Sequence, residues 1–121
     1  MSDWLLSRYQ SPHHRGRPPG TTHEGRASNP LCGDEATLWL RVENGIVRAA
    51  GWDAVGCLIT HAGADLLCEA APGRTPEDVA SWDRARMAAL AGRDVPDPRA
   101  TCLTLAPKAV SAAREFYLPE G

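Results

Sequence analysis

The sequence predicts an α+β fold, a three-stranded antiparallel meander sheet with helices packed on one face, and with an N-terminal and a C-terminal helix. Residues 36–42 alternate apolar and polar side chains, which is typical of a strand with one buried face. Asn44-Gly45 follows directly and indicates a tight hairpin turn, because both positions need positive φ. After residue 60 the chain shows helix caps and helical spacing without another strand pattern. This order of elements favours an α+β layout.

Composition indicates one folded domain. The chain has 121 residues, 43% of them hydrophobic, which suffices for a core of its own. Thirteen Lys and Arg against fifteen Asp and Glu give a net charge of −2, which offers no electrostatic basis for nucleic-acid binding. No apolar run reaches the ~20 residues that span a bilayer, and no signal peptide is visible. We expect a single domain over residues 1–121, in the cytoplasm, without nucleic-acid or membrane partners.

The N-terminal part predicts a helix and then a loop. Residues 2–10 fit a short amphipathic helix that begins after the N-cap Ser2 and stops before Pro12. Residues 11–28 are rich in Pro, Gly, Arg and His and almost free of apolar side chains, so we expect a flexible, solvated basic loop. Its histidines offer adventitious metal binding, and its arginines offer contacts to an acidic partner. These residues are His13, His14, His23, Arg15, Arg17 and Arg26.

The remaining strands and the first long helix follow the hairpin turn. Residues 46–52 predict the return strand, and residues 57–59 predict a very short third strand. Thr60 is a candidate cap for a helix that runs to about residue 71, where Pro72-Gly73 ends it.

Two more helices are expected toward the C-terminus. Thr75 and Pro76 predict the start of a helix that ends at Gly92, and a connector follows. The last helix should cover about residues 105–117. Cys102 would then lie just ahead of a helix.

The cysteines are the candidate functional residues. Cys32 and Asp34 place a thiol and a carboxylate in a tight turn, and Cys57 and Cys102 lie at later element boundaries. Thiolates suit both zinc and iron–sulfur centres, and zinc also accepts a carboxylate oxygen. A cytosolic chain keeps its thiols reduced, which argues against disulfides. No C-x-x-C motif is present, however, so spacing by itself favours unrelated structural cysteines over a metal site.

Two neighbouring residues are expected to have structural roles. Cys68 lies inside a predicted helix and is interpreted as a small buried residue. His61 is close in sequence to Cys57, but we expect a capping or surface histidine rather than a ligand.

Several segments, in order along nearly the whole chain, resemble one known family. They are Tyr9-Gln10-Ser11-Pro12, Asn29-Pro30-Leu31-Cys32-Gly33-Asp34, Gly56-Cys57, Ala62-Gly63-Ala64, Pro72-Gly73-Arg74-Thr75 and Arg99-Ala100-Thr101-Cys102-Leu103-Thr104-Leu105. These segments resemble the iron–sulfur cluster assembly scaffold family of IscU, SufU and the NifU N-terminal domain. The resemblance implies that Cys32, Asp34, Cys57 and Cys102 bind zinc or a two-iron two-sulfur cluster. It also implies a SufS- or IscS-like cysteine desulfurase as partner, with apo iron–sulfur proteins or carriers as recipients.

The chain departs from the pattern of this family at two places. IscU-like members carry His where this chain has Thr101, so this chain resembles SufU more there, as it does at Arg99. The insertion that SufU proteins carry before that Arg has no room between residues 91 and 98. The chain therefore resembles a SufU-like or divergent subtype. Without the family histidine, Asp34 is harder to replace as a ligand.

Three hypotheses follow. The first is a scaffold that holds a nascent cluster on the four ligands and receives sulfur from the desulfurase. The second is a zinc-bound sulfur acceptor in which Cys32 or Cys102 takes the persulfide. The third is an interaction module with purely structural zinc. We favour the first and leave the metal open. A scaffold or sulfur carrier is favoured over a free-standing enzyme, although sulfurtransferase activity fits the second hypothesis.

Overall fold

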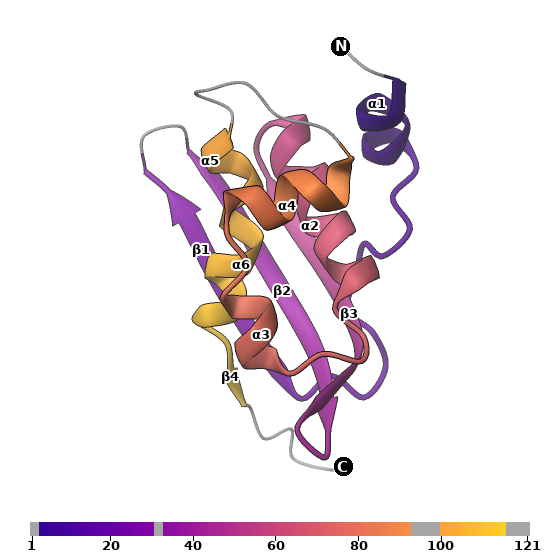
Figure 1. Ribbon diagram of the computed structural model, residues 1–121, viewed down its shortest axis with the longest axis vertical. Coiled ribbons are helices and arrows are strands. Elements are labelled where there is room, and N and C mark those ends of the chain that lie inside the picture. Colours follow the sequence, from indigo (N-terminus) through magenta and orange to yellow (C-terminus); the bar gives the residue numbers. More distant parts are fainter. Residues whose placement is uncertain (1–2, 31–32, 93–99, 116–121) are drawn as a thin grey trace.

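The structure, a computed structural model, describes residues 3–30, 33–92 and 100–115. Its elements are α1 (Asp3–Gln10), β1 (His23–Asn29), β2 (Asp34–Glu43), β3 (Ile46–Val55), α2 (Leu58–Ala70), α3 (Pro76–Ala80), α4 (Arg84–Ala91), α5 (Ala100–Leu103), α6 (Leu105–Ser111) and β4 (Arg114–Glu115). Helices α2 to α6 lie on one face of the sheet, as Figure 1 shows. The predicted α+β class is therefore confirmed.

The sheet is antiparallel with the order β3-β2-β1-β4. Its three long strands, β1, β2 and β3, form a meander, which confirms a three-stranded antiparallel meander, but the predicted third strand at residues 57–59 is wrong. Cys57 is the N-cap of α2, and the next two residues belong to that helix. The third long strand is instead β1, in the stretch that the sequence predicts as a loop.

The packing of α6 explains why β1 lacks a strand pattern. Gly25 is buried, and a Cβ atom there would overlap the backbone oxygen of Ala109 in α6. The helix backbone thus packs directly on the strand backbone, where side chains would normally fill the space. Without large apolar side chains on its inner face, β1 shows no alternation in the sequence.

The hairpin of β2 and β3 forms as predicted. Leu38 and Leu40 in β2 are fully buried. Asn44 and Gly45 both have positive φ, 54° and 75°, and Glu43 pairs with Ile46 across the turn. Strand β3 continues to Val55, three residues beyond its predicted end.

The helix predicted from Thr75 to Gly92 is two helices. Thr75 caps α3, because its hydroxyl accepts a hydrogen bond from the Asp78 N–H at 3.1 Å. Asp83 then caps α4 in the same way, accepting from the Arg86 N–H at 2.9 Å, and so starts a new helix. Gly92 ends α4 with φ of 75°, as predicted.

The C-terminal region also differs from the prediction. The predicted helix over residues 105–117 ends at Ser111, because the chain turns to pair β4 with β1. Cys102 lies inside the short helix α5 rather than ahead of a helix. The connector predicted for residues 93–99 lies outside the described residues.

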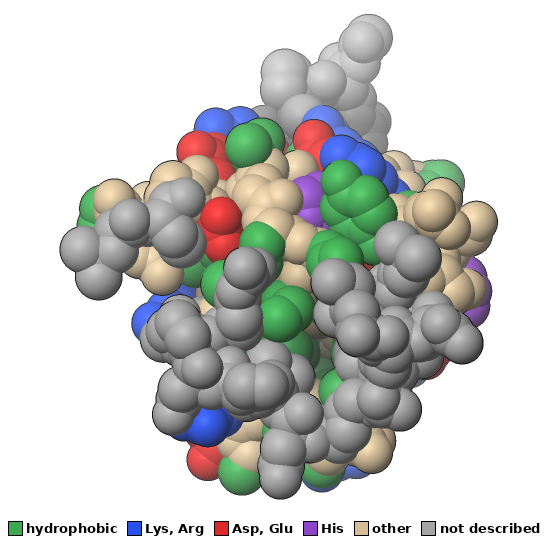
Figure 2. Space-filling view, turned by 90° about the horizontal axis from the view of Figure 1, so that it is seen from above, with side chains coloured by type: hydrophobic (Ala, Val, Ile, Leu, Met, Phe, Trp, Pro, Cys, Tyr) green, Lys and Arg blue, Asp and Glu red, His purple; other side chains and the backbone are tan. Residues whose placement is uncertain are grey.

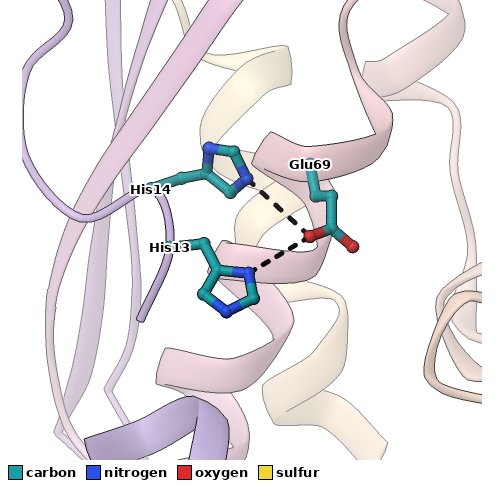
Figure 3. Close-up of side chains that lie close together, drawn as sticks. All are labelled: His13, His14 and Glu69. Atoms are coloured by element: carbon teal, nitrogen blue, oxygen red, sulfur yellow. Dashed lines mark hydrogen bonds and ion pairs between the residues drawn. The ribbon is translucent and has the colours of Figure 1, made fainter. Parts of the chain in front are cut away.

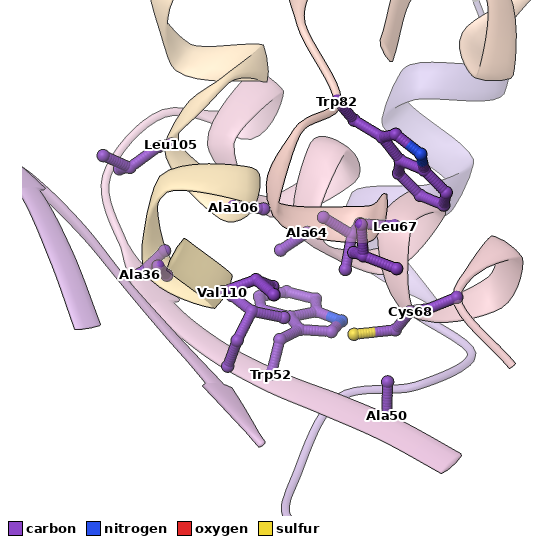
Figure 4. Close-up of a cluster of buried hydrophobic side chains, with 14 of the residues drawn as sticks. Ala36, Ala50, Trp52, Ala64, Leu67, Cys68, Trp82, Leu105, Ala106 and Val110 are labelled. Atoms are coloured by element: carbon purple, nitrogen blue, oxygen red, sulfur yellow. The ribbon is translucent and has the colours of Figure 1, made fainter. Parts of the chain in front are cut away.

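The core fills the space between the sheet and the helices. Trp52 of β3 and Leu67 and Cys68 of α2 face one another there (Figure 4), and all three are almost fully buried. Cys68 is therefore the small buried residue that the sequence predicts. Burial raises the pKa of its thiol well above 9.0, which keeps it protonated and unreactive.

Within the described residues, no helix combines the length and the apolar character that crossing a membrane requires.

Candidate metal centre

Three of the four predicted ligands come together at one end of the sheet. Asp34 is the first residue of β2, Cys57 precedes α2 directly, and Cys102 lies on α5. Their ligand atoms all lie within 4.8 Å of one another. In Figure 1 these element ends meet at the top of the molecule, and Figure 2 looks onto this end. There, hydrophobic side chains gather near the middle and charged ones lie mostly toward the rim.

The fourth predicted ligand, Cys32, lies outside the described residues. Its role as a ligand and as a persulfide acceptor stays a prediction. In the sequence it stands two residues before Asp34, within the connection from β1 to β2.

The side chains of this cluster meet at the carboxylate of Asp34. Its Oδ2 accepts a hydrogen bond from the Thr60 hydroxyl at 2.8 Å. The Sγ atoms of Cys102 and Cys57 lie 3.3 and 3.6 Å from the same oxygen. One oxygen thus accepts from three donors. A cation bound here would take the place of the thiol protons and contact the same atoms.

The two thiols differ in their acidity. Burial acts to raise the pKa of Cys57, but hydrogen bonds, above all with Thr60, outweigh it and leave the pKa below 9.0. Burial, together with hydrogen bonds to Cys57 and Asp34, raises the pKa of Cys102 to about 12. Cys57 is therefore the thiol that gives up its proton more readily, and Cys102 keeps its proton until a cation replaces it.

Burial also distinguishes the ligands. Asp34 and Cys102 are only 5% and 7% exposed, whereas Cys57 is half-buried. Sulfur donors and one harder oxygen donor in such a place fit zinc or iron. Of these described donors, the carboxylate oxygen is the one expected to exchange first at a soft metal centre.

Gly56 makes room for the Asp34 carboxylate. It has φ of 141°, and a Cβ atom there would overlap Oδ1 of Asp34. Gly56→Ala should therefore push the carboxylate away and destabilise the fold by about 1–3 kcal/mol from backbone strain alone. Metal binding measured by isothermal titration calorimetry should weaken in the same variant.

Gly73→Ala is the matched control for this prediction. Gly73 also has positive φ, 92°, but apart from its chain neighbours no atom of the described residues lies within 4 Å of the place that a Cβ atom would take. Its substitution should cost stability and leave metal affinity unchanged. Equal loss of affinity in both variants would show that strain, not contact with Asp34, is responsible.

Two residues near the centre have roles that the sequence does not predict. Thr60 is not a helix cap: it lies within the first turn of α2, 1% exposed, and its hydroxyl binds Asp34. His61 is buried rather than on the surface, with Nδ1 3.0 Å from the backbone oxygen of Cys57 and its ring against Trp52 and Tyr9. The sequence indicates both roles only through spacing: Thr60 and His61 follow Cys57 by three and four residues, which places them next to it on one helix face.

Asp65 is a third residue whose role the sequence does not predict. It is fully buried on α2 and accepts hydrogen bonds from Arg8 and from the indole N–H of Trp52 at 2.8 and 2.9 Å. The backbone N–H groups of His13 and His14 donate to it at 3.1 and 2.7 Å. Asp65 thus fixes the segment after α1, which the sequence predicts as a mobile loop, onto α2.

Two named proteins are similar to part of this chain. The scaffold protein IscU of Thermotoga maritima, an iron–sulfur cluster assembly protein by name, is 36% identical over 80 residues, which are 66% of this chain and 56% of that protein. The zinc-dependent sulfurtransferase SufU of Bacillus subtilis is 29% identical over 70 residues, 58% of this chain and 48% of that protein. The matched parts thus span about half the length of these two relatives.

A solved structure and a family model extend the match to almost the whole chain. SufU of Fervidobacterium islandicum superposes with a TM-score of 0.70, covering 92% of this chain and 93% of that one, at 16% identity. At this identity the likeness shows the fold alone. The model of the NifU-like N-terminal domain matches residues 1–120. This chain belongs to the NifU-like N-terminal domain family.

Proposed function

We propose that the protein is an iron–sulfur cluster assembly scaffold that holds a nascent two-iron two-sulfur cluster on Cys32, Asp34, Cys57 and Cys102. The observation that carries the proposal is the convergence of Asp34, Cys57 and Cys102 within 4.8 Å, from three separate elements. Relatives named as scaffold proteins support it. Sulfur would come from a SufS- or IscS-like cysteine desulfurase, and apo iron–sulfur proteins or carriers would receive the cluster, all in the cytoplasm.

Each side chain at the centre has a different role in such a scaffold. Cys57 and Cys102 supply soft donors, and Cys57 loses its proton more readily. Asp34 supplies a harder oxygen that Thr60 orients through its hydroxyl. Because a carboxylate holds a soft metal centre less firmly than thiolate does, Asp34 would be the described ligand that exchanges most readily.

A second candidate function is a zinc-bound sulfur acceptor for the desulfurase. It is favoured by Thr101, which replaces the histidine of IscU-like chains, and by the name of the Bacillus subtilis relative, a zinc-dependent sulfurtransferase. In this role the same ligands hold zinc. Cys32 or Cys102, as a thiolate, would form a bond to the outer sulfur of the desulfurase persulfide, and the cysteine thiolate of the desulfurase would leave. An interaction module with purely structural zinc is the remaining alternative.

Anaerobic reconstitution tests the scaffold function. The apo-protein, supplied with ferrous iron and sulfide, should gain the visible absorption of a two-iron cluster and bind iron and sulfide in equal amounts. A protein that stays colourless and takes up neither contradicts the scaffold proposal.

A desulfurase assay separates the two remaining functions. Zinc-loaded protein that raises desulfurase turnover and carries a persulfide on Cys32 or Cys102, read by mass spectrometry, supports the sulfur acceptor. Unchanged turnover without persulfide, in a protein that unfolds when zinc is removed, supports the structural module instead.

A further inference from the structure

A second group of metal-ligand side chains lies away from the candidate centre. His13 and His14 follow α1, and Glu69 lies on α2. The Nδ1 of His13 and the Nε2 of His14 lie 3.4 and 3.9 Å from the same Oε1 of Glu69. Figure 3 shows both imidazole rings turned toward this carboxylate. One ligand atom from each residue lies within 4.8 Å of the others.

Asp65 holds the two histidines in place. Both of their backbone N–H groups donate to its carboxylate, and its side chain is fully buried. Asp65 and Glu69 are four residues apart and therefore share one face of α2. The histidine backbone is thus fixed relative to Glu69 before any cation binds, which reduces the ordering cost of binding.

The group is open to solvent. The side chains of His13, His14 and Glu69 are 60%, 34% and 49% exposed. Three protein ligands with solvent on the outer side leave coordination positions for water, as in exchangeable rather than closed metal sites.

Arg8 also binds the Glu69 carboxylate and lowers the affinity of this group for a metal ion. Its Nη1 lies 3.2 Å from Oε1 of Glu69, but its shorter bond, 2.8 Å, is to Asp65. Its Nη2 donates to the other oxygen of Glu69 at 3.4 Å. A carboxylate has lone pairs for both a cation and an Arg, so the two fit together. Nη1 of Arg8 also lies 3.3 Å from Nδ1 of His13, so a metal ion has to displace it from that ring, and the guanidinium charge weakens binding.

We propose that His13, His14 and Glu69 form a second metal site that takes an exchangeable divalent transition-metal ion, zinc or ferrous iron. Two imidazoles and one carboxylate with open positions suit these ions, whereas calcium and magnesium prefer oxygen ligands alone. Glu69 stands twelve residues after Cys57 along α2. At 1.5 Å per residue this separates the two positions by roughly 18 Å, so one ion cannot serve both sites.

Zinc titration of a chain without the first site tests this proposal. In Cys32→Ser/Cys57→Ser/Cys102→Ser, calorimetry should still detect one equivalent of Zn²⁺. Imidazole ¹H–¹⁵N correlation spectra should show the rings of His13 and His14 shifting together while His23 and His61 stay unchanged. If circular dichroism shows that this variant is unfolded, the second Zn²⁺ equivalent added to the wild-type chain is followed in the same spectra.

Single substitutions assign the ligands. His13→Asn, His14→Asn and Glu69→Gln should each weaken Zn²⁺ binding by roughly tenfold or more, since even residues that only orient a metal ligand contribute about this much. His23→Asn is the matched control and should leave the affinity unchanged. The proposal is wrong if the rings of His13 and His14 do not shift at saturating Zn²⁺, or if His23→Asn weakens binding as much as His14→Asn.

Discussion

Cys57→Ala should abolish metal binding at the candidate centre. The substitution removes the more acidic of the two thiols described at this centre and leaves the Asp34 carboxylate with one sulfur neighbour fewer. We expect the affinity for Co²⁺, used as a probe, to fall by well over the roughly tenfold that a supporting residue contributes. The readout is the sulfur-to-cobalt charge-transfer absorption, which thiolate ligands produce and imidazole or carboxylate ligands do not.

Cys68→Ala is the matched control, since it removes a thiol that the core buries completely. It should lower the free energy of unfolding by the cost of a small cavity and leave the cobalt absorption and stoichiometry intact. Loss of the absorption in Cys68→Ala, or its retention in Cys57→Ala, would show that the ligand set is wrong.

Asp65→Ala should be among the most destabilising single substitutions in the chain. Its carboxylate accepts from Arg8, from Trp52 and from two backbone N–H groups, and its side chain has no exposure to solvent. Removing one partner of a buried ion pair costs about 3–5 kcal/mol. Here the Trp52 indole and two backbone N–H groups lose their acceptor as well, while Arg8 keeps Glu69. Urea denaturation followed by tryptophan fluorescence measures this loss.

The same interaction should depend on pH in a known direction. Burial acts to raise the pKa of Asp65, but hydrogen bonds from Arg8 and Trp52 hold it below its ordinary value of 3.8. Its contribution is therefore complete above that value and is lost as the pH falls through the lower pKa of the folded state. The stability difference between wild type and Asp65→Ala should shrink in acid.

Glu77→Ala is the control for Asp65→Ala. Glu77 is an exposed acid on α3, and its loss should change the free energy of unfolding by less than about 0.5 kcal/mol. If Asp65→Ala costs as little as Glu77→Ala at neutral pH, Asp65 does not fix the N-terminal segment.

Local signals in the sequence predict those elements whose stability depends on near neighbours. The alternation from Ala36 to Leu40 predicts β2, because every second side chain packs against the helices. Asn44-Gly45 predicts the hairpin because the turn itself requires positive φ. Thr75 predicts the start of α3 because its hydroxyl caps the third residue after it. In each case the deciding contact lies within a few residues.

Elements that depend on distant contacts escape these local signals. Strand β1 has no apolar pattern, since Gly25 packs against the backbone of α6 rather than through a side chain. The last helix stops at Ser111 because β4 pairs with β1, about ninety residues earlier in the chain. No local signal records either contact.

The candidate centre follows the same division. By itself the sequence determined which side chains are of a ligand type, and the resemblance to the scaffold family predicted Cys32, Asp34, Cys57 and Cys102 as ligands where spacing alone favoured unrelated cysteines. Only the tertiary structure decided that Asp34, Cys57 and Cys102 meet around one carboxylate oxygen, and it added Thr60 to that oxygen. The tertiary structure also shows that the segment at His13 and His14, predicted as a flexible loop, is held in place by Asp65. The physical reason is that a ligand type is a property of one side chain. Its placement depends on a sheet edge and helices brought together across as many as 68 residues of sequence.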